Sequence, residues 1–265
     1  MKLNVCVAGA TGWVGAPLCL AVSRADDLKL VGAVSRTHRG RDLGEVLGDP
    51  GLALTVSGSA AEALDTPADV LVDYTKADVV KQNVLTAIGK GVHVVIGSSG
   101  LTDADFVEID RAATRHKVGV IAAGNFAITA VLLQRFACEA AKHISQWEII
   151  DYASDAKEDA PSGTTRELAF RLSEVRRPEA ARPVAETIGE KESRGATLNG
   201  VQIHSLRLPS YVIGVEVIFG AQNERLTLRH DAGSGAGPYI QGTLLAIRKV
   251  REYVGLIRGL DQVLG

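Results

Sequence analysis

Cysteine is scarce in this sequence, and its few copies show no pairing pattern. The 265 residues include three cysteines, Cys6, Cys19 and Cys138, and no two of them form a C-x-x-C pair. An odd number of thiols within apolar segments indicates reduced side chains packed in the core rather than disulfides or zinc ligands. Because no cluster of His, Cys or carboxylate residues has the spacing of metal ligands either, the sequence predicts no metal site.

An excess of charge of one sign and a long apolar run are missing as well. Lys and Arg number 29 and Asp and Glu 31, so the net charge of −2 provides no field that would attract nucleic acid or an anionic membrane. No apolar stretch approaches the ~20 residues of a transmembrane helix, and the first apolar run is broken by Gly9 at about half the length of a signal-peptide core. We therefore expect a cytoplasmic protein that binds a small molecule, with neither nucleic acid nor membrane as a partner.

Apolar residues, in contrast, make up 46% of the chain, enough for the core of one large domain or two smaller ones. In the first part, short β-branched runs such as "LNVCVAG" alternate with helical stretches such as "APLCLAVSRA", which predicts an α/β domain with a mostly parallel sheet. From about residue 145, longer strands joined by turns, with one helix over 164–174, predict an α+β domain with a mixed or antiparallel sheet. The final stretch, "GPYIQGTLLAIRKVREYVGL", predicts a helix.

A glycine-rich turn follows the first predicted strand. It reads Gly9-Ala10-Thr11-Gly12-Trp13-Val14-Gly15 and stands between a strand and a helix, where a Rossmann-type dinucleotide domain has its pyrophosphate loop. Such a turn lets the backbone approach the pyrophosphate and directs a helix N-terminus at its charge. The alternative interpretation is an ordinary glycine turn, and Trp13 either covers the cofactor or packs between helix and sheet.

The end of the second predicted strand indicates which nucleotide binds. Ser35 and Arg36 stand there, followed by Arg39 and Arg41, and no acidic residue is present to hold a ribose 2′-hydroxyl. Guanidinium groups match phosphate oxygens, so the sequence favours NADP(H), with NADH as a possible second cofactor. The alternative is that these arginines are solvated side chains of a loop.

Several segments together resemble 4-hydroxy-tetrahydrodipicolinate reductase, formerly called dihydrodipicolinate reductase. They are the glycine loop at 9–15, "VDYT" at 72–75, "IGSSG" at 96–100, "AGNFA" at 123–127 and "KEDAPSGT" at 157–164. The resemblance covers nearly the whole chain, and the K-x-D-x-P-S-G-T element is its most specific part. It implies reduction of a cyclic unsaturated dicarboxylate in lysine biosynthesis by a hydride from NADPH or NADH.

The resemblance also implies an architecture. A dinucleotide-binding domain would occupy residues 1–124, a substrate-binding and oligomerisation domain residues 125–237, and a C-terminal helix over 238–265 would pack back on the first domain. The protein would be a homotetramer assembled through the sheet of the second domain.

Site residues follow from the same resemblance. Lys157 would be the catalytic residue, and Ser154, Ser162, Gly163 and Thr164 would contact the anionic substrate. A turn of small residues at the start of a helix presents N–H groups to a carboxylate, and a lysine ammonium can pair with that charge or donate a proton. The residues implied for the cofactor are Gly9, Ala10, Thr11, Gly12, Trp13, Val14 and Gly15 at the pyrophosphate, Ser35 and Arg36 at the adenosine ribose, Gly97, Ser98 and Ser99 at the nicotinamide, and Gly124, Asn125, Phe126 and Ala127 closing over it.

The sequence departs from the family pattern at two points. The family usually has two histidines four and three positions before the lysine, where this chain has Ala153 and Ser154, and an arginine expected after His230 is missing. Three hypotheses therefore stay open. The protein catalyses the usual reaction, with Lys157 as proton donor, aided by Tyr152, Asp155 or water; it reduces another imine or 2-oxo acid as an imine reductase or amino-acid dehydrogenase; or it binds the nucleotide without catalysis.

Overall fold

The computed structural model describes residues 2–180 and 182–264, which form two compact units. The first unit contains the chain up to Ile128 and again from Gly235 onward, and the second contains Thr129–Ser234. The divisions thus fall after residues 128 and 234, whereas the sequence placed them after 124 and 237.

The first unit is built on a six-stranded sheet in which every strand is parallel to its neighbours. Both faces of its central strands are buried, as near-continuous runs such as "VLVD" and "GVIA" require. The α/β, Rossmann-type fold predicted from the sequence is therefore confirmed. The strands lie in the order β11 (Gly255–Arg258), β5 (Gly119–Ala122), β4 (His93–Ile96), β3 (Val70–Asp73), β1 (Leu3–Ala8) and β2 (Leu28–Val34).

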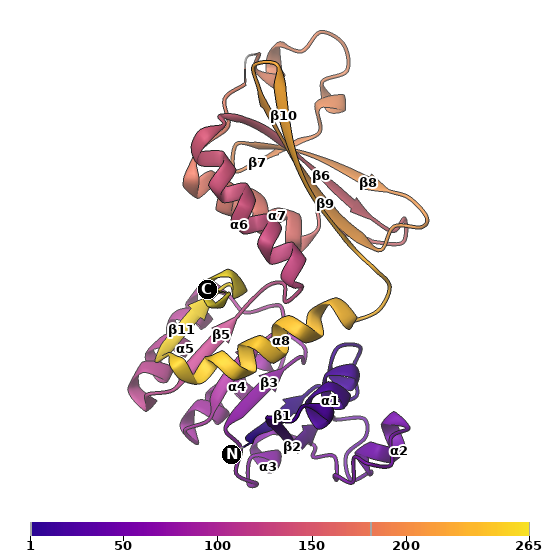
Figure 1. Cartoon of the computed structure of the whole chain (residues 1–265), viewed down its shortest axis with the longest axis vertical. Helices are drawn as coiled ribbons and strands as arrows, with labels where there is room; N and C mark the ends of the chain where they lie inside the picture. Colours follow the sequence, from indigo (N-terminus) through magenta and orange to yellow (C-terminus); the bar gives the residue numbers. More distant parts are fainter. Residues whose placement is uncertain (1, 181, 265) are drawn as a thin grey trace. The chain divides into compact units, whose positions relative to one another are not determined.

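Helices cover both faces of this sheet. One face packs against α4 (Val80–Gly89) and α5 (Asp103–His116), whose apolar side chains share a core with alternate residues of the strands. Figure 1 shows α1 (Gly15–Arg24) and α8 (Gly237–Lys249) beside each other on the opposite face. The remaining helices of this unit are short: α2 (Leu43–Leu47), α3 (Ala60–Ala63), and the 3₁₀ turns η3 (Val250–Glu252) and η4 (Leu260–Val263).

The C-terminal segment corrects one prediction. A single helix over 238–265 is wrong beyond Lys249, because the chain there turns and adds β11 to the edge of the sheet. Gly255, at φ +88°, starts that strand in a conformation that favours glycine. Gly119 on the neighbouring β5 makes room for the turn, since a Cβ there would lie 2.0 Å from the Val250 carbonyl oxygen.

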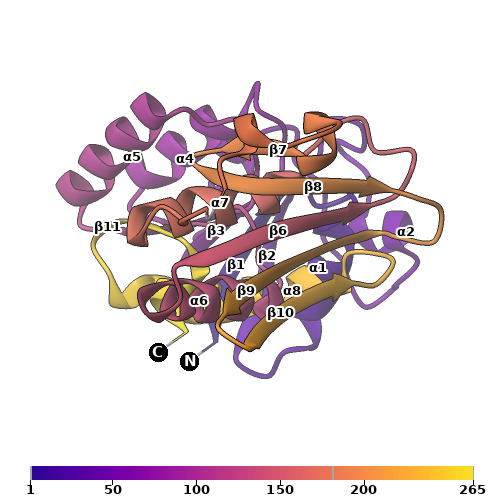
Figure 2. The ribbon, with the colours of Figure 1, turned by 90° about the horizontal axis from the view of Figure 1, so that it is seen from above.

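The second unit is a five-stranded mixed sheet with two helices on one face, and the α+β prediction with a mixed sheet is confirmed. Strands β6 and β8 are parallel, and the other neighbours are antiparallel. Figure 2 shows the strands in their spatial order, β10, β9, β6, β8 and β7. The elements are α6 (Ile128–His143), β6 (Gln146–Ala153), α7 (Gly163–Val175), η1 (Val184–Glu186), η2 (Lys191–Arg194), β7 (Ala196–Leu198), β8 (Val201–Arg207), β9 (Ile213–Ala221) and β10 (Glu224–Ala232).

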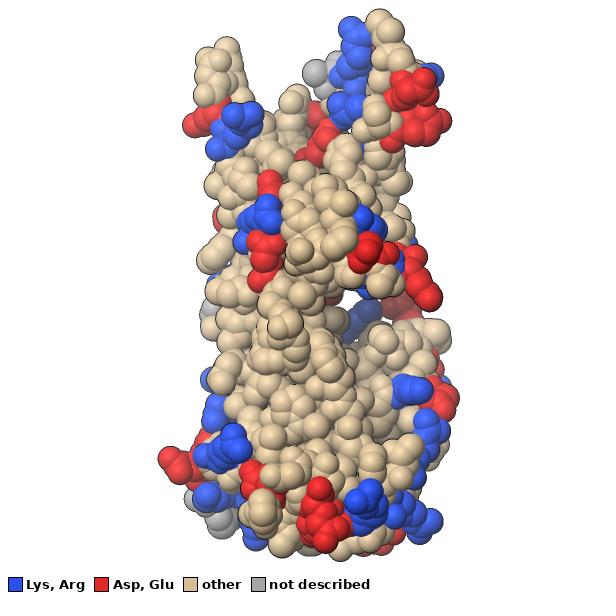
Figure 3. Space-filling view, turned by 90° about the vertical axis from the view of Figure 1, so that its right-hand side faces the viewer, with Lys and Arg blue, Asp and Glu red and all other residues tan. Residues whose placement is uncertain are grey.

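Cysteines and charges agree in part with the expectations. Cys6 and Cys19 are buried and unpaired, but Cys138 is only partly buried. On the face drawn in Figure 3, positive and negative side chains are intermixed. Within residues 2–180 and 182–264, no helix has both the length and the apolar character needed to cross a bilayer, and no group of three or more His, Cys, Asp or Glu side chains could hold a metal ion.

Candidate nucleotide and substrate sites

The glycine loop follows β1 and leads directly into α1. Its backbone is fixed by N–H groups of Gly9 and Ala10, which each donate to the Val34 carbonyl at 3.0 Å, and by the Gly12 N–H, which donates to the Gly9 carbonyl at 2.9 Å. Val14 occupies the N-cap position of α1 and provides no side-chain cap. Within the first turn, the Ala16 N–H donates to the Gly12 carbonyl at 3.0 Å and Pro17 has no N–H, so the start of α1 offers an external acceptor the N–H of Gly15. This end of the helix suits a phosphate group.

Two glycines of the loop are required by close approaches of the backbone. Gly9 has φ +81°, and a Cβ there would lie 2.4 Å from the Tyr74 carbonyl oxygen. At Gly15 a Cβ would lie 2.0 Å from the Gly9 carbonyl oxygen. The loop is thus pressed between the start of α1 and the end of β3, as a dinucleotide fold requires. The residues present fit a nicotinamide dinucleotide.

Polar side chains from the segments that follow β1 and β2 meet at this loop. The hydroxyls of Thr11 and Ser35 are 2.8 Å apart, and Nδ1 of His38 lies 3.1 Å from the Thr11 hydroxyl. Arg36 is 60% exposed and pairs with Asp78 at 3.1 Å. The arginine is therefore available at the surface beside the glycine loop, held by one exposed partner.

Trp13 lies in the glycine loop but not in the core. It is 62% exposed, and its ring meets that of Tyr239 in α8 edge-on, with centroids 5.6 Å apart. The structure therefore excludes the interpretation that Trp13 packs between helix and sheet.

The loop after β4 is anchored to β3. The Gly97 N–H donates to the Asp73 carbonyl at 2.9 Å, and the Ser98 hydroxyl donates to the Asp73 carboxylate at 2.6 Å. The Ser98 side chain is therefore already engaged within the unit. Ser99 is exposed, and Gly97 is needed because a Cβ there would lie 2.2 Å from the Tyr74 ring.

The predicted "GNFA" segment is mostly buried. Phe126 is 1% exposed and its ring lies edge-on to Tyr74 at 6.1 Å, while the Asn125 side chain accepts from the Ala127 N–H at 2.8 Å. Gly124 alone among these four residues is exposed. Any contact of this segment with a cofactor would therefore involve Gly124 or the backbone.

In the second unit, the predicted substrate loop is organised by a carboxylate that sequence reasoning missed. Asp151, fully buried in the second half of β6, accepts from the Ser162 N–H at 3.0 Å, from the Ser162 hydroxyl at 2.6 Å and from the Thr165 hydroxyl at 2.7 Å. Arg207 of β8 pairs with it at 2.7 Å. Burial alone would raise the pKa of Asp151, but the hydrogen bonds from Ser162, Arg207 and Thr165 outweigh burial and hold that pKa below its ordinary range.

This network gives the residues of the Ser-Gly-Thr turn different roles. Ser162 is 1% exposed, caps α7 by accepting from the Thr165 N–H and donates to Asp151. Its hydroxyl is therefore structural. Gly163 begins the helix, is exposed, and has no atom within 4 Å of the position of a Cβ. The first turn of α7, including the partly exposed Thr164, can thus be approached by an anion.

Lys157 lies in the loop between β6 and α7. Its ammonium pairs with Asp159 at 2.5 Å, and its side chain is 30% exposed. The pairing lowers the pKa of Asp159. The Lys157 N–H donates to the Ser154 carbonyl at 3.0 Å, so the loop is tightly turned there.

The positions where the family carries histidines hold no substitute acid. Ala153 is fully buried, and the Ser154 hydroxyl donates to the Asp155 carboxylate at 3.1 Å. The Tyr152 hydroxyl donates to Glu216 at 3.1 Å, and burial followed by the Glu216 charge raises the Tyr152 pKa. Of the candidate proton donors, Lys157 is thus the cationic one.

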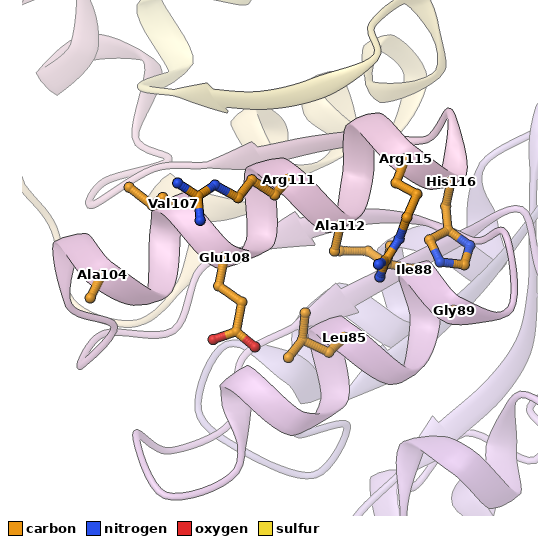
Figure 4. A pocket seen from close by; sticks show the side chains of 10 residues that line it. All are labelled: Leu85, Ile88, Gly89, Ala104, Val107, Glu108, Arg111, Ala112, Arg115 and His116. Carbon is orange, nitrogen blue, oxygen red and sulfur yellow. The ribbon is translucent and has the colours of Figure 1, made fainter.

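A groove of about 690 Å³ lies elsewhere, between α4 and α5 of the first unit. Arg111, Arg115 and Glu108 extend from α5 and Leu85 from α4 (Figure 4). It runs along the outside of the helices and contains none of the predicted site residues. Because open α/β sheets bind ligands at the carboxyl ends of their strands, we assign no part of the site to it.

Comparison with known proteins matches both parts of the chain to the same family. The model "Dihydrodipicolinate reductase, N-terminus" matches residues 3–126, and "Dihydrodipicolinate reductase, C-terminus" matches residues 129–264. The 4-hydroxy-tetrahydrodipicolinate reductase of Desulfitobacterium hafniense is 40% identical over 265 residues, covering 99% of each chain, and that of Synechococcus elongatus is 39% identical over 272 residues, covering 99% of this chain and 98% of the relative.

A solved structure agrees. The dipicolinate-bound dihydrodipicolinate reductase of Paenisporosarcina sp. TG-14 superposes with a TM-score of 0.87 at 31% identity, covering 100% of both chains. Two family models together span almost the whole sequence, and the relatives named above match 99% of it. The chain therefore belongs to the dihydrodipicolinate reductase family.

Proposed function

We propose that this protein is a cytoplasmic NADPH-dependent reductase of 4-hydroxy-tetrahydrodipicolinate in lysine biosynthesis. The observation that carries this proposal is the intact "KEDAPSGT" loop, in which Lys157 precedes a helix start held in place by Asp151. A protein that only bound a nucleotide would not need such an arrangement for a carboxylate. The solved relative named above is bound to dipicolinate, a dicarboxylate, which supports an anionic substrate.

The two units would supply the two halves of the reaction. The glycine loop and the N-terminus of α1 would hold the pyrophosphate, and the first turn of α7 would hold a substrate carboxylate with the Lys157 ammonium. Bound NADPH supplies a hydride to an electrophilic carbon of the substrate's unsaturated bond. The substrate then needs one proton, which Lys157 or a water molecule delivers.

Lys157 can serve this role because its present partner is exchangeable. Asp159 is 52% exposed at its side chain, and an exposed ion pair is worth only about 0–1 kcal/mol. A substrate carboxylate can therefore replace Asp159 beside the ammonium.

The preference for NADPH rests on Arg36. Its guanidinium is exposed beside the glycine loop, and its partner Asp78 is exposed as well. A 2′-phosphate carries more charge than a single carboxylate and binds a guanidinium through two parallel hydrogen bonds, so it would displace Asp78. NADH lacks that phosphate and would leave the Arg36–Asp78 pair intact.

A second candidate is reduction of another imine or 2-oxo acid. The observation that favours it is the absence of imidazole at Ala153 and Ser154, where Ala153 is buried and the Ser154 hydroxyl is bonded to Asp155. Loss of polar contacts changes which substrate's groups find partners. The carboxylate-binding turn would be retained in this case.

The test is NADPH oxidation with freshly generated 4-hydroxy-tetrahydrodipicolinate, run beside a panel of cyclic imines and of 2-oxo acids with ammonia. Turnover of the first substrate supports the proposal. Turnover only within the panel supports the second candidate. Nucleotide binding without turnover of any substrate would indicate a non-catalytic protein and contradict both.

We also propose a homotetramer assembled through the second unit's sheet. The face opposite α6 and α7 carries Glu216, Arg229 and Ile218, which neither helix covers. Sedimentation equilibrium measures the mass directly. A monomer at micromolar concentration would contradict this assembly.

A further inference from the structure

Asp73, the last residue of β3, is a fully buried carboxylate with four hydrogen-bond donors. Its Oδ1 accepts from the Thr75 N–H at 2.9 Å, from the Thr75 hydroxyl at 2.6 Å and from the Ser98 hydroxyl at 2.6 Å. Its Oδ2 accepts from the Asn83 amide at 2.9 Å. A buried charge is tolerated only when it is satisfied in this way.

The donors lie in three segments, one of which, the loop after β4, carries residues predicted to meet the nicotinamide. Thr75 lies just after β3, Ser98 lies in the loop after β4, and Asn83 lies in α4. In the sheet, β3 stands between β1 and β4. The order of strands reverses between β1 and β3, and α/β sheets bind dinucleotides in the crevice at such a reversal.

Tyr74 connects the same turn to the rest of the unit. Its N–H donates to the Ala8 carbonyl at 2.9 Å, and its hydroxyl lies 2.6 Å from that of Thr243, a buried residue of α8. Its ring fills the space next to Gly97, and its carbonyl lies against Gly9. The turn after β3 therefore touches both the glycine loop and the loop after β4.

We propose that Asp73 is a positioning residue that fixes the nicotinamide half of the cofactor site. It acts through Thr75 and Ser98, whose hydroxyls it engages, so that the loop backbones present one fixed surface. This inference rests on the proposed function, because it assumes a nicotinamide dinucleotide. It adds Asp73 to the residues of the cofactor site, with the role of holding the loops after β3 and β4 in the geometry that binds the nicotinamide.

The role predicts a split between the two halves of the cofactor. In an Asp73→Asn variant, the neutral amide oxygen accepts more weakly from three donors, and the new NH₂ group faces the amide of Asn83. The segments of Thr75 and Ser98 should loosen. Tyr74 stays held by the Ala8 carbonyl and the Thr243 hydroxyl, so the glycine loop and Arg36 should keep their positions. We expect NADPH affinity and kcat each to fall at least about tenfold, a loss typical of small misplacements of bound groups. Affinity for 2′,5′-ADP, which has only the adenosine half, should change less than about twofold.

Titration of each variant with NADPH and with 2′,5′-ADP measures this split without any substrate. Ser98→Ala removes one of the hydroxyl donors and should reproduce it, which provides a second test if Asp73→Asn does not fold. The effects of the two substitutions should not be additive in the double variant, since they break the same hydrogen bond. Ser23→Ala is the matched control, because the Ser23 hydroxyl donates only to Leu20 within α1.

Equal losses of affinity for both ligands would overturn the positioning role and indicate a general structural one. Unchanged NADPH affinity and kcat in Asp73→Asn would overturn it as well. The binding results do not depend on which substrate is turned over, so failure of the substrate assignment would leave this test intact. Failure of the unsubstituted protein to bind NADPH would contradict both proposals.

Discussion

The contact between Gly15 and the glycine loop predicts a large effect of a single methyl group. A Cβ at Gly15 would lie 2.0 Å from the Gly9 carbonyl oxygen, and ordinary contact begins at 3.4 Å, so the atoms must separate by 3.4 − 2.0, or 1.4 Å. Gly9 has no room to move back, because the Tyr74 carbonyl oxygen lies only 2.4 Å from the position that a Cβ on Gly9 would take. The loop must therefore shift relative to the start of α1.

Such a shift exceeds the tolerance of a hydrogen bond, whose donor–acceptor distance spans only about 2.7 to 3.2 Å. We expect Gly15→Ala to destabilise the protein by about 1–3 kcal/mol, the usual cost of overpacking. NADPH affinity should fall at least about tenfold, which corresponds to about 1.4 kcal/mol. Thermal unfolding and fluorescence titration with NADPH measure the two effects.

Gly89→Ala is the matched control for this substitution. Gly89 ends α4, and no atom lies within 4 Å of the position of its Cβ. Alanine is the better helix former by up to about 1 kcal/mol, so this variant should be as stable as the parent or more so. If Gly15→Ala bound NADPH as tightly as the parent and unfolded at the same temperature as Gly89→Ala, the reasoning from the close approach would be refuted.

Three further predictions concern the cofactor, the substrate and acid stability. Arg36→Ala should reduce the preference for NADPH over NADH in kcat/KM by about tenfold or more. The control is Arg24→Ala, at an exposed arginine of α1, which should leave kcat/KM with both cofactors unchanged. Equal losses of kcat/KM with both cofactors in Arg36→Ala would contradict the assignment. Lys157→Ala should lower kcat/KM by about 10² or more and leave NADPH affinity unchanged, with the exposed Lys191 as control; loss of NADPH binding would place the lysine in a different site. Because the folded-state pKa of Asp151 lies below its ordinary value of 3.8, its stabilisation is present above that value and is lost as the pH falls through the folded-state pKa. Asp151→Asn should therefore unfold at a lower temperature than the parent at neutral pH, and its unfolding temperature should depend less on pH in the acid range. A pH dependence equal to the parent's would contradict this.

The sequence predicts those parts of the fold that depend on local patterns. Alternating strands and helices, and glycines at fixed spacing after the first strand, were enough for the parallel sheet and the position of the loop over 9–15. The approach at Gly15 explains why that spacing is informative, because the backbone contact leaves no room for a side chain.

Features that depend on distant partners could not be predicted in the same way. Strand β11 has only four residues, and its pairing with β5 depends on a turn that fits against Gly119. The Asp151–Arg207 pair joins residues 56 apart in the sequence. An acidic residue in the apolar run "WEIIDYA" is a signal that buried partners are needed, but it does not name them. For the same reason Ser162, expected to contact substrate, is found with its hydroxyl buried as a helix cap.

The central claim is hydride transfer from NADPH to 4-hydroxy-tetrahydrodipicolinate, and an isotope measurement tests it most directly. The protein would be incubated with freshly generated substrate and with NADPH that carries two deuterium atoms at C4 of the nicotinamide. The molecular mass of the product would then be measured by mass spectrometry. We predict a product one mass unit heavier than that from unlabelled NADPH, formed in proportion to the NADPH oxidised. Oxidation of labelled NADPH without deuterium in the product, or no reduced product at all, would contradict the account.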